Sequence, residues 1–221
     1  MITPRLDNLS SAQRRLWDEL AATPEDFALY GGTAIALRLG HRVSVDFDFF
    51  SQLPFAPAEL QARVPYLSGG RLLQAAPHTL TMGVERGGPV KVSFFGRLRL
   101  GQVEPHDVAA GPSLKIASLV DVAGMKVAVV TQRAELKDYL DLHALLTQAR
   151  IPLPVMLAAA GVIYGPVYNS LVSLKAISYH DDAALGDLPD AMRRDLITAV
   201  RSVDVEHLPV LNAVRLRSDL P

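Results

Sequence analysis

The sequence predicts a mixed α/β fold, in which a first half with a small mixed sheet, residues 1–115, is followed by a helical half, residues 116–221. Two observations support this division. Apolar segments of strand length, bounded by glycine or proline, are concentrated before Pro112. Longer segments with helical spacing of apolar residues follow it. We therefore expect an α/β core and a C-terminal helical region.

The expected elements of the first half have local chemical reasons. A serine can cap a helix, glycine suits the left-handed residue after one, and Gly-Gly-Pro suits a bend between strands. The predicted order is helix 10–21, strand 26–30, helix 33–39 ending at Gly40, strand 43–50, helix 57–67, and a hairpin over 78–98 that turns at 86–89.

The second half is expected to be almost entirely helical. The segments "SLVDVAGMKVAVVTQ" (118–132) and "AELKDYLDLHALLTQA" (134–149) have helical patterns. Residues 167–221 also read as mostly helical, with "PDAMRRDLITAVRSV" (189–203) as the clearest case. Little strand signal follows Pro112. The predicted helices therefore form a region distinct in composition from the first half.

Composition narrows the class of protein. Nearly half of the residues are apolar (49%), which is typical of a globular protein with a substantial core. There is no cysteine, so disulfides and thiolate metal sites are excluded and the cytoplasm is the simplest location. The longest apolar stretch, 151–168, is interrupted by glycines and prolines, and we expect no membrane association. The net charge of −1 indicates no large nucleic-acid footprint, although a local basic patch remains compatible with it.

Two carboxylates stand out in the apolar strand "VSVDFDFF" (43–50). Asp46 and Asp48 are two residues apart, so on a strand they share one face and lie roughly 7 Å apart along the chain. Such a pair can converge on Mg²⁺, which prefers one or two carboxylates together with phosphate oxygens. The alternative is a half-exposed strand whose polar face simply meets water. For an isolated Asp-x-Asp pair this alternative would be preferred.

The glycines that precede this strand favour the functional interpretation. Gly31 and Gly32 follow a strand and open a helix, with Thr33 at its cap or first turn. Bare backbone N–H groups at a helix start form an anion site, and glycine lets a phosphate approach closely. The sequence thus predicts a phosphate cradle beside a metal site. We include Ser44 among the candidate nucleotide-binding residues.

A second group of charged residues lies in the helical half. Lys126, Arg133 and Lys137 are spaced by seven and four residues, so one continuous helix would align them, and even a broken one would keep them close. Such cations suit a triphosphate or an RNA backbone. Asp138 and Asp141 share a neighbouring face, where they could orient the lysines or act on a substrate hydroxyl. The alternative is a solvated helix face with ordinary ion pairs.

These segments carry a resemblance to a known group of enzymes. A Gly-Gly turn followed by Asp-x-Asp on an apolar strand resembles the polymerase-β-like nucleotidyltransferase superfamily. More closely, "GGTAIALRLGHRVSVDFDFF" and "KVAVVTQRAELKDYLDLHALL" resemble the AbiEii/AbiGii-type nucleotidyltransferase toxin family. The later segment "SLKAISYHDD" is similar to members of that group as well. The resemblance extends from about residue 29 to residue 200 and implies the corresponding fold.

The resemblance also implies an activity. It is the Mg²⁺-dependent transfer of a nucleoside monophosphate from an NTP to an acceptor, RNA or tRNA, by the toxin of a toxin–antitoxin or phage-defence system with a cognate antitoxin protein. Each candidate residue then has a role. Asp46 and Asp48 would hold the metal, Lys126 would neutralise the triphosphate, Asp138 would position or deprotonate the acceptor, and Gly31, Gly32, Thr33, Ser44, Arg133 and Lys137 would bind the nucleotide.

One departure from the superfamily pattern affects this interpretation. Many members carry a third carboxylate on a later strand, and the corresponding position in "VKVSFF" is Ser93. Either two carboxylates suffice, or Glu85 or Asp107 substitutes, or the activity is weakened. The last possibility leads to a second hypothesis, a non-catalytic module of the same fold that binds a nucleotide or a partner protein.

Overall fold

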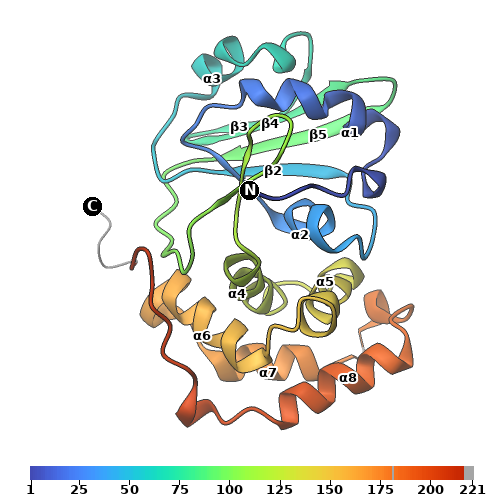
Figure 1. Ribbon diagram of the computed structural model, residues 1–221, viewed down its shortest axis with the longest axis vertical. Coiled ribbons are helices and arrows are strands. Elements are labelled where there is room, and N and C mark those ends of the chain that lie inside the picture. Colours follow the sequence, from blue (N-terminus) through green and yellow to red (C-terminus); the bar gives the residue numbers. More distant parts are fainter. Residues whose placement is uncertain (181, 217–221) are drawn as a thin grey trace. The chain divides into compact units, whose positions relative to one another are not determined.

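The computed structural model describes residues 1–180 and 182–216 (Figure 1). The chain forms two compact units. The first comprises Met1–Arg99 and His106–Ala117, and the second comprises Leu100–Pro105 together with the chain from Ser118 onward. The first unit contains the sheet and the second is helical, so the mixed α/β class predicted from the sequence is confirmed.

The first unit is built on a seven-stranded mixed sheet with the order β3-β4-β5-β2-β1-β7-β6. Two strand pairs, β2 with β5 and β1 with β7, are parallel, and the remaining neighbours are antiparallel. The strands are β1 (Ala28–Tyr30), β2 (Asp46–Phe50), β3 (Arg71–Ala76), β4 (Thr79–Glu85), β5 (Pro89–Phe95), β6 (Asp107–Val108) and β7 (Lys115–Ile116).

Helices cover both faces of this sheet. In Figure 1, α1 (Ser11–Leu16) and α3 (Pro57–Arg63) lie on one side of it and α2 (Gly31–Leu39) lies on the other. The unit also contains three short 3₁₀ helices, η1 (Leu6–Asn8), η2 (Trp17–Ala22) and η3 (Pro65–Leu67). Ser10 caps α1 through a capping box, and Gly40 ends α2 in the left-handed conformation, as its residue type predicts.

Several predicted boundaries differ from the structure; the strand expected over 26–30, for example, spans only Ala28–Tyr30, and the helix expected over 33–39 begins at Gly31. The helix expected over 10–21 changes from α to 3₁₀ at Trp17. The helix expected over 57–67 is divided in two, because Pro65 has no N–H for a continued α-helix. The strand expected from residue 43 begins only at Asp46, where pairing with β5 starts. The hairpin formed by β4 and β5 lies where it was predicted.

The side chains of β2 alternate between the two faces of the sheet. Phe47 and Phe49 are fully buried, and the ring of Trp17 contacts Phe47 from the α1 side. Asp46, Asp48 and Phe50 face the other way and are only partly buried. The apolar residues of this strand therefore provide core packing, while its two carboxylates remain accessible on the α2 side.

The second unit is a group of helices in which α4 and α6 pack closely. A Cβ atom on Gly124 would lie 2.8 Å from the backbone nitrogen of Ala160, so only glycine permits this approach. The helices are α4 (Leu119–Val129), α5 (Leu136–Thr147), α6 (Leu153–Tyr164), η4 (Gly165–Val167), α7 (Ser170–Ser178), η5 (Ala183–Leu185), α8 (Asp190–Arg201) and η6 (Val205–His207). None of the helices in the described residues is long and apolar enough to span a membrane.

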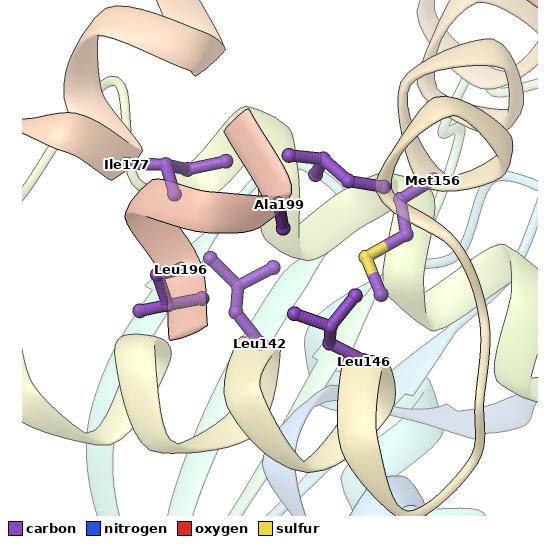
Figure 2. Close-up of a pocket in the computed structure, with 7 residues that line it drawn as sticks. Leu142, Leu146, Met156, Ile177, Leu196 and Ala199 are labelled. Atoms are coloured by element: carbon purple, nitrogen blue, oxygen red, sulfur yellow. The ribbon is translucent and has the colours of Figure 1, made fainter. Parts of the chain in front are cut away.

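Helix α8 closes the apolar interior of this unit. Its Leu196 and Ala199 point toward Leu142 and Leu146 of α5 and Met156 of α6 (Figure 2). The small cavity between them has a volume of about 10 Å³ and an entirely apolar lining. This is a packing defect of the core rather than a binding site, because it has no polar group to orient a ligand.

Candidate active site

Asp46 and Asp48 lie on β2 between the parallel neighbour β5 and the antiparallel neighbour β1. In register, Asp46 stands beside Lys91 and Asp48 stands between Ser93 and Tyr30. Since directly paired residues of neighbouring strands share a face, these five side chains form one row of polar and aromatic groups on the α2 side. The two carboxylates thus share a face, as their spacing predicts.

Gly31 brings the start of α2 against the second carboxylate. Its φ is +72°, and a Cβ atom at this position would lie 3.0 Å from Oδ2 of Asp48. Both the backbone conformation and the available space therefore require glycine. The bare backbone at the helix start lies directly beside Asp48, which is the local arrangement that the Gly-Gly turn predicts.

The hydroxyl groups near this turn bond to one another. The Thr33 hydroxyl hydrogen-bonds the Ser44 hydroxyl over 2.8 Å and also the backbone carbonyl of Asp46. Both side chains are buried, with 1% and 7% of their surface exposed. In this arrangement Thr33 and Ser44 fasten α2 to the beginning of β2 and so fix the position of the Asp46 backbone.

Lys91 is a member of the site that sequence reasoning missed. Its Nζ lies 2.9 Å from Oδ2 of Asp46, and its side chain is 46% exposed. The signal was present in the sequence, because Lys91 and Ser93 are two residues apart on a strand and must share a face. Once β5 pairs in parallel with β2, that face is the one that carries the two carboxylates.

The position expected for a third carboxylate holds Ser93, which stands beside Asp48. The two suggested substitutes are engaged elsewhere in the first unit. Glu85 accepts a hydrogen bond from the Gly88 N–H in the hairpin turn, and Asp107 forms an ion pair with Arg38 at 2.9 Å. Within residues 1–180 and 182–216, no group of three or more His, Cys, Asp or Glu side chains is arranged to hold a metal ion. Asp46 and Asp48 are thus a pair.

The charged residues of the second unit form a buried cluster. Nζ of Lys126 lies 2.6 Å from Oδ1 of Asp138 and 2.7 Å from Oδ2 of Asp141. Both carboxylate side chains are fully buried, and the Lys126 side chain is 9% exposed. The lysine that interrupts the apolar sequence "GMKVAVV" therefore has two internal anions as partners. Asp138 and Asp141 share a face of α5, as their spacing of three residues predicts.

Arg133 joins this cluster from the connection between α4 and α5. Its Nε donates to Oδ2 of Asp138 over 2.9 Å, while its side chain remains 46% exposed. Lys137 instead pairs with Glu135 at 2.8 Å, and this hydrogen bond lowers the pKa of the Glu135 carboxyl. Because α4 ends at Val129 and α5 begins at Leu136, the three cations do not lie on one continuous helix. Lys126 and Arg133 meet at Asp138, and Arg133 and Lys137 meet at Glu135, where the Arg133 distance is 3.4 Å.

Comparison with protein families identifies the family of this chain. The model of the family described as nucleotidyl transferase AbiEii toxin, type IV toxin–antitoxin system, matches residues 15–207. The chain belongs to the AbiEii nucleotidyltransferase toxin family. The match includes every residue proposed above for the two charged groups, and the resemblance inferred from the sequence motifs is confirmed. By its family the protein is therefore a nucleotidyltransferase with a toxin role.

Individual relatives of this AbiEii family member extend the comparison. An uncharacterized protein of Aquifex aeolicus (strain VF5), aq_aa25, is 32% identical over 160 residues, which cover 72% of this chain and 75% of the relative. Among solved structures, MenT4, a nucleotidyltransferase toxin of Mycobacterium tuberculosis H37Rv, is 18% identical with a TM-score of 0.61, covering 88% of this chain and 83% of MenT4. An H. pylori protein described as a nucleotidyltransferase is also 18% identical, with a TM-score of 0.57 and coverage of 89% and 92%. At such identity the two structures support the fold.

One motif of the AbiEii resemblance is only partly described by the structure. The segment "SLKAISYHDD" ends in two aspartates, of which Asp181 lies outside the described residues. Its first part forms α7, where Ser173 is buried and its hydroxyl donates to the carbonyl of Val127 over 2.6 Å. The described part of this motif therefore fastens α7 to α4, the helix that carries Lys126.

Proposed function

We propose that this AbiEii family member transfers a nucleoside monophosphate from an NTP to RNA, with tRNA as the foremost candidate acceptor, in a reaction that depends on Mg²⁺. The observation that carries the proposal is the pair Asp46 and Asp48 on the accessible face of β2, with Gly31 beside Asp48. Because NTPs and tRNA are cytoplasmic, the reaction belongs in that compartment. A cognate antitoxin would complete the system that the family description names.

The residues present suit a hard divalent cation. Two carboxylates on one strand face supply oxygen ligands, and the glycine cradle leaves space beside Asp48 that a Cβ atom would fill. We assign Asp46 and Asp48 as the Mg²⁺ ligands, with oxygens of the NTP completing the shell. When bound, Mg²⁺ supplies positive charge that orients the phosphates and stabilises the charge on the departing pyrophosphate.

The chemistry left to the chain is positioning and charge stabilisation. In the transfer, a hydroxyl oxygen of the acceptor forms a bond to the α-phosphorus of the NTP, the bond to the bridging oxygen breaks, pyrophosphate leaves, and the hydroxyl proton is released. The bare backbone at Gly31 and Gly32 suits phosphate oxygens, since α2 begins there. Lys91, half-exposed beside Asp46, adds a cation on the same face.

We assign Lys126 to the same reaction as a fixed cation. An ammonium group has three N–H donors, and two of them are directed to Asp138 and Asp141. Held in this way, the group can offer its third donor to a phosphate oxygen with little loss of side-chain entropy. Arg133 and Lys137, each nearly half-exposed, are the cations proposed to bind the nucleotide or the RNA backbone.

For Asp138, the contacts favour a positioning role over proton abstraction. Its side chain is fully buried and already accepts from both Lys126 and Arg133. A group that removes the acceptor proton must come within hydrogen-bond reach of that hydroxyl, and both of these cations compete for the same oxygens. We therefore propose that Asp138 orients Lys126 and Arg133 and that it does not act as the general base.

A non-catalytic binding module is the second candidate function. Ser93 in place of a third carboxylate favours it, and so does the ion pair between Asp46 and Lys91, which occupies one oxygen of the proposed metal site. The complete Asp46 and Asp48 pair on an accessible face opposes it. Such a module would bind Mg²⁺ and NTP without releasing pyrophosphate.

Incubation of the protein with total RNA, Mg²⁺ and each α-³²P-labelled NTP tests the proposal. The wild-type protein should label RNA, and the double variant Asp46→Asn/Asp48→Asn should reduce labelling by at least about a thousandfold, because the electrostatic stabilisation of the transferring group is lost. Glu59→Gln, which changes an exposed carboxylate on α3, is the matched control and should keep full activity.

The outcomes separate the candidate functions. Labelling that persists in the double variant would show that the proposed site is wrong. NTP binding without labelling of any RNA or protein, and without pyrophosphate release, would favour the binding module. Labelled protein in place of labelled RNA would keep the transferase chemistry and refute the RNA acceptor.

A further inference from the structure

A pocket of the second unit lies outside the charged cluster that the proposed reaction uses. It has a volume of about 240 Å³ and is bounded by the end of α4, the end of α6, η4 and the start of α7. Its lining combines two aromatic rings, aliphatic side chains and two amides, among them Tyr164, Tyr168, Val167, Val172, Asn169 and Gln132. Such a mixture is typical of sites for small organic groups.

The aromatic wall of this pocket is preformed. The rings of Tyr164 and Tyr168 are stacked, with centroids 6.4 Å apart and an angle of 28° between their planes. The Tyr168 hydroxyl donates to the Ser173 hydroxyl over 2.9 Å, and that hydroxyl donates to the carbonyl of Val127. The wall is thus anchored to α4, and little ordering is needed when a planar group binds to it.

The tyrosines are also electrically neutral. Burial raises the pKa of Tyr164 to about 12, and burial likewise raises the pKa of Tyr168 to about 12. Both phenols therefore stay protonated throughout the physiological range and do not repel a ligand that carries phosphate. Both residues therefore line the pocket without adding a negative charge to it.

Aliphatic side chains at the mouth of the pocket are unusually exposed. Val167 has 75% and Val172 has 49% of its surface exposed. If a planar ring stacked against the tyrosines, these two side chains would cover the rest of its apolar surface. Two amides complete the mouth. Asn169 accepts a hydrogen bond from the Leu171 N–H at its Oδ1, which leaves its NH₂ group as a donor, and Gln132 also lines the pocket.

The residue that follows Gln132 in the sequence is a cation. Gln132 lines the pocket, and the next residue, Arg133, presents a guanidinium group that is 46% exposed and fixed by Asp138. A nucleotide combines a planar, hydrogen-bonding base with a phosphate a few bonds away. An aromatic pocket with amides at its mouth and an arginine at the adjacent position matches both parts of that ligand.

We propose that this pocket binds a nucleobase, which stacks on Tyr164 and Tyr168 while its phosphate meets Arg133. The inference rests on the proposed function, because it names the recognition element that holds a substrate of that reaction. The base can belong to the NTP or to a single-stranded RNA acceptor, and its chemistry is the same in both. Separate binding measurements distinguish the two sources.

The test uses variants at the pocket mouth that leave the core unchanged. Val167→Glu and Val172→Glu place a carboxylate in the mouth, and Leu171→Glu places the same charge on a neighbouring residue that is 60% exposed and does not line the pocket. Affinity for a fluorescent single-stranded RNA decamer is measured by anisotropy, and affinity for each NTP by equilibrium dialysis. Circular dichroism verifies that each variant is folded.

Both mouth variants should weaken binding of one of these ligands by about tenfold or more, since one stacked base contributes about 1–3 kcal/mol. Leu171→Glu should change it by less than about twofold. Weakened decamer binding assigns the pocket to the acceptor, and weakened NTP binding assigns it to the donor. Equal affinities in all three variants would overturn the inference, and so would loss of antitoxin binding with both nucleotide affinities unchanged.

The binding measurements are independent of catalysis. If the wild-type protein binds the decamer or an NTP through this pocket but never labels RNA, the inference stands and the proposed transfer fails. If RNA labelling requires Asp46 and Asp48 while Val167→Glu and Val172→Glu change neither affinity, the transfer stands and the inference fails.

Discussion

Two pairs of aspartates in this protein are held in opposite ways. Asp46 and Asp48 lie on a strand with partly exposed side chains, and the lysine beside them, Lys91, is itself 46% exposed. Asp138 and Asp141 lie on a helix, and their side chains have no exposed surface. The ammonium group of Lys126 contacts both of them. The two aspartate pairs therefore lie in different electrostatic environments, one partly exposed to water and the other buried.

The difference indicates what each pair can do. A buried carboxylate must be paired, and the second unit supplies Lys126 and Arg133 to balance Asp138 and Asp141 with two positive charges. On β2, Asp46 pairs with Lys91, which is itself half-exposed, and both carboxylates are partly exposed. The partly exposed pair on β2 is thus within reach of an external cation, whereas the pair on α5 is buried around Lys126.

The largest stability difference is expected between the two lysines. Lys126→Met should lower the free energy of unfolding by about 3–5 kcal/mol, because it removes the cation that two buried carboxylates share. Lys91→Met, the matched change at the exposed pair, should lower it by about 1 kcal/mol or less. Urea unfolding followed by circular dichroism measures both values.

Equal losses in the two lysine variants would contradict the contrast between the pairs. A small loss in Lys126→Met alone would mean that water reaches Asp138 and Asp141 and that the cluster is not buried. A large loss in Lys91→Met would mean that its ion pair with Asp46 is a structural requirement of the sheet.

A smaller effect is expected at the two left-handed glycines of α2. Gly31→Ala and Gly40→Ala both introduce a Cβ at a positive φ, and each should cost about 1–3 kcal/mol of stability. Only the Gly31 Cβ would meet Asp48, at 3.0 Å, whereas the Gly40 Cβ would meet Asn8 and Arg5. Titration with Mg²⁺ and NTP should therefore show weakened binding in Gly31→Ala and unchanged binding in Gly40→Ala. Equal affinities of the two variants for Mg²⁺ and NTP would show that Gly31 is not part of the binding site.

The smallest effect is expected at the exposed member of the buried cluster. Arg133→Ala should cost about 1 kcal/mol, because its side chain is nearly half-exposed and Asp138 keeps Lys126 as a partner. RNA affinity should fall in the same variant, since Arg133 is proposed to meet phosphate. A stability loss as large as that of Lys126→Met would show that Arg133 is a structural part of the cluster.

The sequence predicts best the features that have local causes. Gly40 ends α2, and the hairpin between β4 and β5 turns at Gly87 and Gly88, because both positions need backbone conformations that glycine favours. Asp46 and Asp48 share a face because a strand repeats every two residues. Ser93 could also be identified as the neighbour of Asp48, since its position follows from the strand that pairs with β2.

Features that depend on distant pairing were missed. Strand β3 is exposed along its whole length and so lacks the alternation that would reveal a strand, while β6 and β7 are only two residues long. The contact of Lys91 with Asp46 requires the parallel register of β2 and β5. In the second unit, a lysine that interrupts an apolar helix must reach either water or an anion. The sequence leaves this choice open, and the turn between α4 and α5 decides it by bringing Asp138 and Asp141 to Lys126.

The central claim is that Asp46 and Asp48, on the partly exposed face of β2, bind a complex of Mg²⁺ and NTP. Calorimetric titration with a non-hydrolysable NTP analogue, with and without Mg²⁺, tests it on the wild-type protein and on Asp46→Asn/Asp48→Asn. The wild-type protein should bind the analogue more tightly when Mg²⁺ is present, and the double variant should lose that dependence while it unfolds at a similar urea concentration. Equal Mg²⁺ dependence in the two proteins would contradict the account.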